Sequence, residues 1–174
     1  LSEDYAKKIL PERWRNIVIT LKCNWNRRVP TNENFRYLQV LHVDNIKLTE
    51  LPPMGPNLLE LTCTHCDLRE LPPMGPNLQI LDCSGNYLTK LPPMGPNLLE
   101  LKCVSSYLTE LPPMGTNLQI LTCWSNKLTK LPPMGTNLKD LSCSSNQLRE
   151  LPPMGPNLQI LECSSNQLRE LPPM

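Results

Sequence analysis

Cysteine is the residue whose chemistry and spacing stand out first in this chain. Its thiol can ligate a metal, form a disulfide or pack as a small apolar side chain. Of the eight cysteines, seven fall on one 20-residue lattice in which Val43 fills the remaining slot: Cys23, Cys63, Cys83, Cys103, Cys123, Cys143 and Cys163. Because valine can take the same slot, the lattice favours packing. A series of unpaired thiols fits a reducing compartment, and the alternative of disulfides between adjacent units has poor geometry for neighbours that point the same way.

The segment Cys63-Thr64-His65-Cys66 is where a metal site could be sought. A closed zinc site needs four ligands, and no second ligand pair accompanies this one. A methionine series from Met54 to Met174 could suggest copper, but its place beside Pro-Pro favours packing on the back of the molecule. The sequence has neither a glycine-rich phosphate loop nor a Ser-His-Asp set in a cleft. We therefore predict a protein that is not an enzyme and has no metal and no cofactor.

A 20-residue repeat carries the cysteines. Near-copies of Leu-Pro-Pro-Met-Gly-(Pro/Thr)-Asn-Leu begin at Leu51, Leu71, Leu91, Leu111, Leu131 and Leu151. Each continues as Leu-x-x-Leu-x-Cys-x-x-Asn-x-Leu, in which we number the first leucine, such as Leu78, as position 1. A fixed short period of this kind is typical of a solenoid, whose units bury their apolar faces against each other.

Each part of the unit predicts a local structure. Positions 4 and 6 are two residues apart and point to the same side of a strand, so stacked units predict a parallel sheet. The asparagine at position 9, as in Asn86, can satisfy backbone groups where the chain turns. Leu-Pro-Pro forces an extended path on the opposite side, and the following Met-Gly-Pro-Asn turns the chain back. An extended back matches the strand spacing, so we expect little curvature.

This pattern resembles the leucine-rich repeat family over residues 18–174. The short Leu-Pro-rich unit is most similar to bacterial effectors of the YopM and IpaH type, although cysteine replaces their usual aliphatic residue and the ubiquitin-ligase domain of the IpaH type is absent. Near-identical copies also resemble repeat proteins of large DNA viruses of the Marseillevirus group. The resemblance implies a solenoid with a parallel β-sheet on the concave face, an extended, polyproline-like convex side and a host protein as partner.

The repeat predicts two parts of the chain and two different ends. Residues 1–17, with Ser2-Glu3-Asp4 at their start, are expected to form a short helical N-terminal cap, or alternatively a degenerate F-box-like segment. The solenoid of about eight units then spans residues 18–174 and shows no C-terminal cap. An open sheet edge favours association, so we expect a homodimer through Leu158, Leu161, Cys163 and Leu168.

Charge and hydropathy exclude some partners. The net charge is +1, from 17 basic and 16 acidic residues, which gives no general attraction to nucleic acid or to an anionic membrane. No apolar run approaches the roughly 18 residues of a membrane span. We predict an intracellular protein that is located in the cytoplasm, with the cytoplasm of a host cell as one alternative, and that binds protein and neither nucleic acid nor membrane.

The residues that differ between copies are the candidates for partner binding. Positions 3, 5, 7, 8 and 10 lie beside the strand and should face the open side. Exposed aromatics flanked by charge are typical of binding hot spots, and the predicted surface comprises His42, His65, Asp82, Tyr87, Lys102, Val104, Tyr107, Thr122, Trp124 and Lys127. The alternative is scattered surface residues between duplications. A 40-residue alternation, in which Leu59-Glu60 is followed by Gln79-Ile80, indicates that the duplicated segment was two units long.

Three functions remain compatible with the sequence. The first is a non-enzymatic protein-interaction module that presents its sheet to a partner. The second is a ubiquitin-ligase substrate adaptor that uses residues 1–17 to recruit the ligase. The third is a structural protein that assembles through its C-terminal end.

Overall fold

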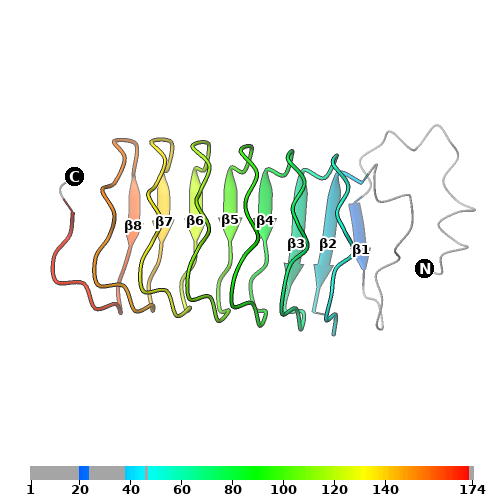
Figure 1. Ribbon diagram of the computed structural model, residues 1–174, viewed down its shortest axis with the longest axis horizontal. Helices are drawn as coiled ribbons and strands as arrows, with labels where there is room; N and C mark the ends of the chain where they lie inside the picture. The colour runs from blue at the N-terminus through cyan, green and yellow to red at the C-terminus, as the bar shows by residue number, and fades with distance from the viewer. Residues whose placement is uncertain (1–19, 24–37, 46, 173–174) are drawn as a thin grey trace, which may run out of the picture.

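A computed structural model describes residues 20–23, 38–45 and 47–172. Both predictions for residues 1–17, the helical cap and the F-box-like segment, lie outside these residues. The strands form a single sheet in chain order, with β1 and β8 at opposite ends of the row (Figure 1). They are β1 (Thr20–Cys23), β2 (Val40–Asp44), β3 (Glu60–Thr64), β4 (Ile80–Asp82), β5 (Glu100–Lys102), β6 (Ile120–Thr122), β7 (Asp140–Ser142) and β8 (Ile160–Glu162).

Every strand pairs in parallel with the next at a register of 20 residues. Leu61 lies opposite Leu81, and Leu81 lies opposite Leu101. Because the register equals the repeat length, each side chain faces its equivalent in the neighbouring unit across the strand spacing of about 4.8 Å. The prediction of a solenoid with a parallel sheet is confirmed.

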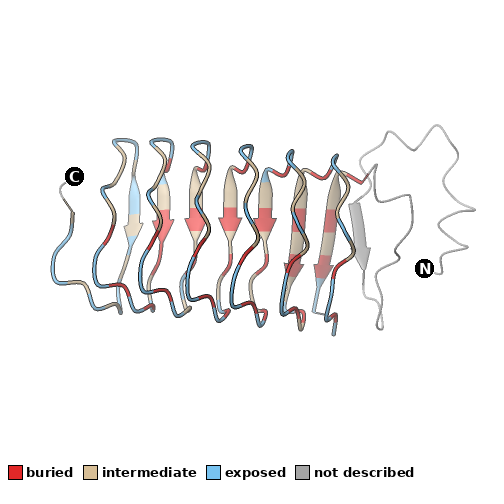
Figure 2. Ribbon diagram, viewed as in Figure 1, coloured by how far each residue is buried: buried red, intermediate tan, exposed pale blue. Residues whose placement is uncertain are grey.

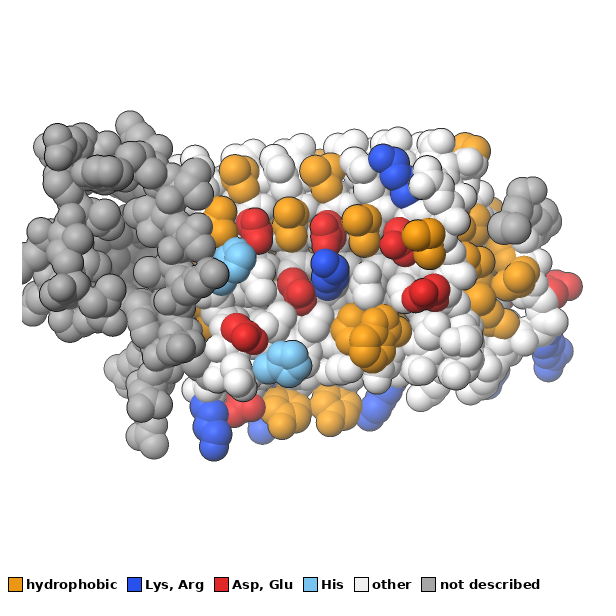
Figure 3. All heavy atoms as spheres, turned by 180° about the vertical axis from the view of Figure 1, so that it is seen from behind, with side chains coloured by type: hydrophobic (Ala, Val, Ile, Leu, Met, Phe, Trp, Pro, Cys, Tyr) orange, Lys and Arg blue, Asp and Glu red, His pale blue; other side chains and the backbone are white. Residues whose placement is uncertain are grey.

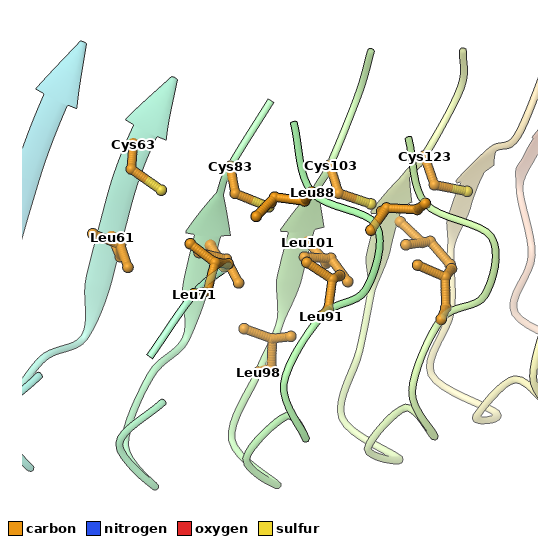
Figure 4. Close-up of a cluster of buried hydrophobic side chains, with 14 of the residues drawn as sticks. Leu61, Cys63, Leu71, Cys83, Leu88, Leu91, Leu98, Leu101, Cys103 and Cys123 are labelled. Atoms are coloured by element: carbon orange, nitrogen blue, oxygen red, sulfur yellow. The ribbon is translucent and has the colours of Figure 1, made fainter. Parts of the chain in front are cut away.

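The core is a column of leucine and cysteine that runs the length of the solenoid. Leu81 and Cys83, at positions 4 and 6 of one unit, are completely buried, and Val43 is equally buried in the slot that lacks cysteine. Figure 2 shows the buried segments repeating from unit to unit, and Figure 4 shows leucine and cysteine side chains of successive units pointing into the same layer. The cysteine lattice is therefore a packing feature, as predicted.

Burial also determines the chemistry of these thiols. Loss of solvation raises the pKa values of Cys63 and Cys103 well above that of an ordinary thiol, and the nearby thiols add to the effect. The same loss of solvation raises the pKa of Cys143 to about 12. Because the thiolate is the reactive form, these side chains are protonated and unreactive at neutral pH.

The back of each unit is extended, with no helix among the described residues. The Asn77 side-chain amide donates to the Pro56 carbonyl of the previous unit at 2.9 Å, and the same bond recurs from Asn97 to Pro76 at 3.1 Å. A Cβ on Gly75 would come within 3.0 Å of the Gly55 carbonyl oxygen, so glycine allows adjacent turns to approach. Met54 to Met154 pack partly buried against the core.

The position-9 asparagines tie neighbouring units together inside the solenoid. The Asn86 amide donates to the carbonyls of Cys63 at 2.7 Å and Cys83 at 2.9 Å, and its oxygen accepts from the Leu68 amide at 3.2 Å. Asn126, Asn146 and Asn166 repeat the arrangement. Ser106 takes this position in one unit, and its buried hydroxyl has no hydrogen-bond partner among the described residues.

In the part of the chain that the structure describes, no helix has the length and apolar character that a membrane span requires.

Candidate partner-binding face of the sheet

Two side-chain rows cross the outer face of the sheet, one from each outward-pointing position of the strands. Positions 3 and 5 point away from the core because they alternate with the buried leucine at position 4. The fixed register places position 5 of successive units side by side, as in Asp82, Lys102 and Thr122. Figure 3 shows this face with its mixed hydrophobic and charged side chains.

The position-10 residues form an aromatic stack at the rim of the face. The Tyr87 and Tyr107 rings lie with centroids 6.0 Å apart and planes 12° apart, and Lys127 Nζ lies 5.0 Å from the Tyr107 ring centroid. The Tyr107 amide donates to the Leu88 carbonyl at 2.9 Å, which fixes the backbone under the ring. Both tyrosines remain about half exposed. We name Tyr87, Tyr107 and Lys127 the rim stack.

Trp124 lies at position 7, where the strand ends. Its indole is 42% exposed. The backbone beneath it is held in place, because the Trp124 carbonyl accepts from the Ser105 amide at 3.1 Å and from the Asn126 side chain at 3.3 Å. Val104, the equivalent residue of the preceding unit, is half-buried. The indole has no part in the core, so its exposure is not a requirement of the repeat.

Lys102 is the cation at the centre of the face. Its ammonium lies 2.5 Å from the Glu100 carboxylate. That hydrogen bond raises the pKa of Lys102, and the Glu100 and Asp82 charges add to it, while partial burial opposes the shift. The ammonium is therefore held in place as a charged group on β5.

The two histidines each lie beside a carboxylate. His42 Nε2 is 2.9 Å from Glu60 Oε1, and His65 Nδ1 is 3.7 Å from Asp44 Oδ1. The His65 backbone has a φ of 50°, and its ring lies over Gly85, where a Cβ would come within 2.7 Å of the ring. These histidines belong to the units of β2 and β3.

The contacts and the register define three groups of residues within the predicted surface. The rim stack is one, Asp82, Lys102 and Thr122 share a row of the sheet, and Trp124 stands at the strand ends. The possible metal segment does not converge on one point, because Cys63 and Cys66 are buried while the His65 side chain is 70% exposed. Within the described ranges, no three His, Cys, Asp or Glu side chains could hold a metal ion.

One row of the face was missing from the sequence-based site. Position 3 alternates aliphatic and acidic residues across adjacent strands, and the alternation is visible as a line of orange and red side chains in Figure 3. The row consists of Val40, Glu60, Ile80, Glu100, Ile120, Asp140 and Ile160. Its signal in the sequence is the 40-residue alternation of Leu59-Glu60 with Gln79-Ile80.

The residues proposed for self-association lie in the last described unit. Leu158, Leu161, Cys163 and Leu168 are half-buried, whereas their equivalents one unit earlier are fully buried. Ile160 is 50% exposed on the outer face of β8. Homodimerisation through this end stays a prediction.

Comparisons with known proteins identify the repeat. The profile of the Leucine Rich Repeat family matches residues 77–99. The fold is similar to that of YopM from Yersinia enterocolitica, with 31% sequence identity over 80% of this chain and a TM-score of 0.78. It is also similar to a domain of InlJ from Listeria monocytogenes that is described as including a cysteine ladder, with 28% identity over 87% of this chain and a TM-score of 0.70.

A second YopM structure, the leucine-rich effector protein of Yersinia pestis, gives 26% identity over 83% of this chain and a TM-score of 0.53. The chain spans 31% of the Y. enterocolitica protein, 53% of the Y. pestis protein and 35% of the InlJ domain. A sequence search of curated proteins found no significant match.

Proposed function

We propose that this chain, a leucine-rich repeat solenoid that resembles YopM, is a non-enzymatic protein-interaction module whose partner is an intracellular protein of a host cell. The partner binds across the outer sheet face and its rim. The observation that carries the proposal is the exposure of Trp124, Tyr87 and Tyr107 on a backbone that is held rigidly beneath them.

The energetics of the face support a binding role. Large aromatic side chains supply much of the free energy at protein interfaces, and they do so best when they are already ordered before binding. The rim stack meets this condition because Tyr107 is held between Tyr87 on one side and Lys127 on the other. The solenoid itself gains nothing from an exposed indole at Trp124, since the core is complete without it.

The likeness to YopM and InlJ agrees with this proposal, because the Y. pestis protein is described as an effector and the InlJ domain as functional. The thiols of the cysteine ladder support a reducing, intracellular location. Cys83 and Cys103 are buried and unbridged, and they pack well without oxidation.

Affinity capture from host-cell lysate tests the proposal. The wild-type chain and Trp124→Ala are used as paired baits, and proteins enriched on the wild type alone are identified by mass spectrometry. The affinity of the best candidate is then measured by calorimetry with purified Trp124→Ala and Tyr107→Ala. We expect each substitution to weaken binding by at least about tenfold, as loss of a hot-spot aromatic does.

The matched controls are Gln147→Ala and Gln167→Ala, which change the same position 10 in the last two units. These substitutions should leave the affinity unchanged. Equal affinity of wild type, Trp124→Ala and Tyr107→Ala for the purified partner would refute the proposed binding surface.

A further inference from the structure

The position-3 row gives the outer face a chemical pattern that the fold does not require. Along the row, Glu60 lies opposite Ile80, Ile80 opposite Glu100, and Glu100 opposite Ile120. Asp140 and Ile160 continue the alternation on β7 and β8. Separation of like charges accounts for a neutral residue between acids. It does not by itself select isoleucine, because threonine or serine, which hold position 5 at Thr62, Thr122 and Ser142, would separate the charges equally well.

The face is also strongly acidic for a chain whose net charge is +1. From β2 to β8, positions 3, 5 and 7 carry six carboxylates: Asp44, Glu60, Asp82, Glu100, Asp140 and Glu162. The one lysine at these positions, Lys102, pairs with Glu100, and His42 lies beside Glu60, so the acids outnumber the basic side chains on the face. A negative surface repels phosphate and anionic lipid, so it disfavours nucleic acids and membranes as partners. It attracts basic protein segments, and the isoleucines between the acids add apolar contacts.

We propose that this sheet face binds a basic amphipathic α-helix of the partner protein, laid across the strands with lysine or arginine over the acids and aliphatic residues over the isoleucines. This inference rests on the proposed function, because it specifies the chemistry of the partner in that same role. The helix lies along the position-3 row, at the start of each strand, and Trp124 at position 7 lies four residues further along the chain from Ile120.

The spacing of the row favours a helix over an extended strand. The two outer acids, Glu60 and Asp140, are four strands apart, which is about 19 Å at the usual strand spacing. One face of a helix shows residues i, i+3 or i+4, and i+7, so two basic residues fourteen positions apart lie about 21 Å from each other. The difference of about 2 Å is within the reach of lysine side chains.

Other conformations fit the row less well. Side chains on one face of an extended strand are about 6.8 Å apart, so four steps along a bound strand would span about 27 Å. Its side chains would therefore not stay aligned with the residues of the row, which are one strand spacing apart. One face of a polyproline helix presents a side chain about every 9.3 Å, which matches the spacing of the acids. It presents no further side chain between them that could contact the isoleucines. A helix with alternating basic and aliphatic turns satisfies both members of the row.

The test uses a synthetic 21-residue helical peptide with lysine at every seventh position and leucine midway between, on one face. Its control has the same composition with the lysines moved to the opposite face. Binding to the full chain is measured by fluorescence anisotropy at low and high salt. We expect the patterned peptide alone to bind, and its Kd to rise with salt because the contacts are ionic.

Protein variants locate the site. Glu60→Gln, Glu100→Gln and Asp140→Asn together should raise the Kd of the peptide by at least about fivefold, as loss of three exposed ion pairs implies. Ile80→Thr with Ile120→Thr should also weaken binding. The matched control, Glu110→Gln, Glu150→Gln and Glu170→Gln, removes three exposed acids away from the row and should leave the Kd unchanged.

Equal effects of the row variant and its control would overturn the inference, and so would equal binding of the two peptides. That outcome leaves the proposed function open to its own test, because Trp124→Ala can still weaken binding of the captured partner. If the peptide binds as expected but Trp124→Ala leaves the affinity for the captured partner unchanged, the proposed aromatic binding surface is refuted and the proposed binding of a basic helix is supported.

Discussion

Tyr87 and Tyr107 stack on each other across one repeat, with ring centroids 6.0 Å apart and planes inclined by 12°. The two residues are 20 positions apart in the sequence, which is the register of the sheet, so equal side chains at equal positions must lie one above the other. The same rule aligns the cysteines and asparagines inside the solenoid and the acids and isoleucines outside it. Any single substitution can therefore be compared with an equivalent position in a neighbouring unit.

The rim stack should contribute only modestly to folding. Tyr107→Ala removes the contact with Tyr87 and the cation–π contact with Lys127, and we expect it to lower the free energy of unfolding by about 1–2 kcal/mol. Urea denaturation measures the change. Tyr107→Phe keeps both ring contacts and should cost less than half as much; an equal loss would show that the hydroxyl, not the ring, is responsible.

The position-9 asparagines predict two substitutions that change the free energy of unfolding in opposite directions. Asn146→Ser should lower the free energy of unfolding by at least about 2 kcal/mol, because it removes bonds to the Cys123 and Cys143 carbonyls inside the solenoid. Ser106→Asn should raise it by about 1 kcal/mol, because the new amide can make the bonds that Ser106 leaves unmade.

The control for Ser106→Asn is Ser105→Asn, the same replacement one residue earlier on the exposed surface. Asparagine accepts the positive φ of 50° at this position, so stability should hardly change. Both variants are followed by urea denaturation. Stabilisation by Ser105→Asn equal to that by Ser106→Asn would contradict an internal hydrogen-bonding role.

The buried thiols predict a loss of stability at alkaline pH. Burial raises the pKa of Cys143 to about 12 and that of Cys103 well above the usual value, whereas thiols in the unfolded chain titrate near about 8.5. The folded chain thus keeps protons that the unfolded chain releases. The contribution is complete below about pH 8.5, and above it the free energy of unfolding falls by about 1.4 kcal/mol per pH unit for each buried thiol.

Urea denaturation between pH 8 and pH 10.5 measures this slope. Cys103→Val removes one buried thiol, so the fall of the free energy of unfolding with pH should become shallower by the contribution of that thiol. Valine fits this buried position, because Val43 occupies the equivalent position of another unit. An unchanged slope in the variant would mean that other groups cause the alkaline loss.

Gly85 and His65 should be energetically coupled. Gly85 has a φ of 69°, and a Cβ there would come within 2.7 Å of the His65 ring. Gly85→Ala should therefore cost about 1–2 kcal/mol of unfolding free energy. In a His65→Ala background the steric part disappears, so a smaller loss is expected; an identical loss would assign the whole effect to the backbone. Ser125→Ala, at an equivalent φ of 59°, is the control and should be nearly neutral.

Much of the site could be predicted because the repeat fixes which positions are inside. Once Leu81 and Cys83 occupy the core, Tyr87 and Trp124 have no place in it, and their exposure follows. What could not be predicted is which exposed residues meet. The stacking of Tyr87 on Tyr107 is such a contact, because position 10 lies past the strand ends and outside the strand pairing.

The sequence by itself determined the repeat length, the parallel sheet, the cysteine core and the extended back, because a 20-residue unit with leucine and cysteine two residues apart can bury its apolar side only by stacking on a copy of itself. Only the tertiary structure decided the contacts between units. It set the contact of His42 with Glu60, the hydrogen bonds of Asn86, and the line of acids and isoleucines. Those contacts join residues that the chain separates by a whole unit or nearly so, and the register of the sheet brings them together.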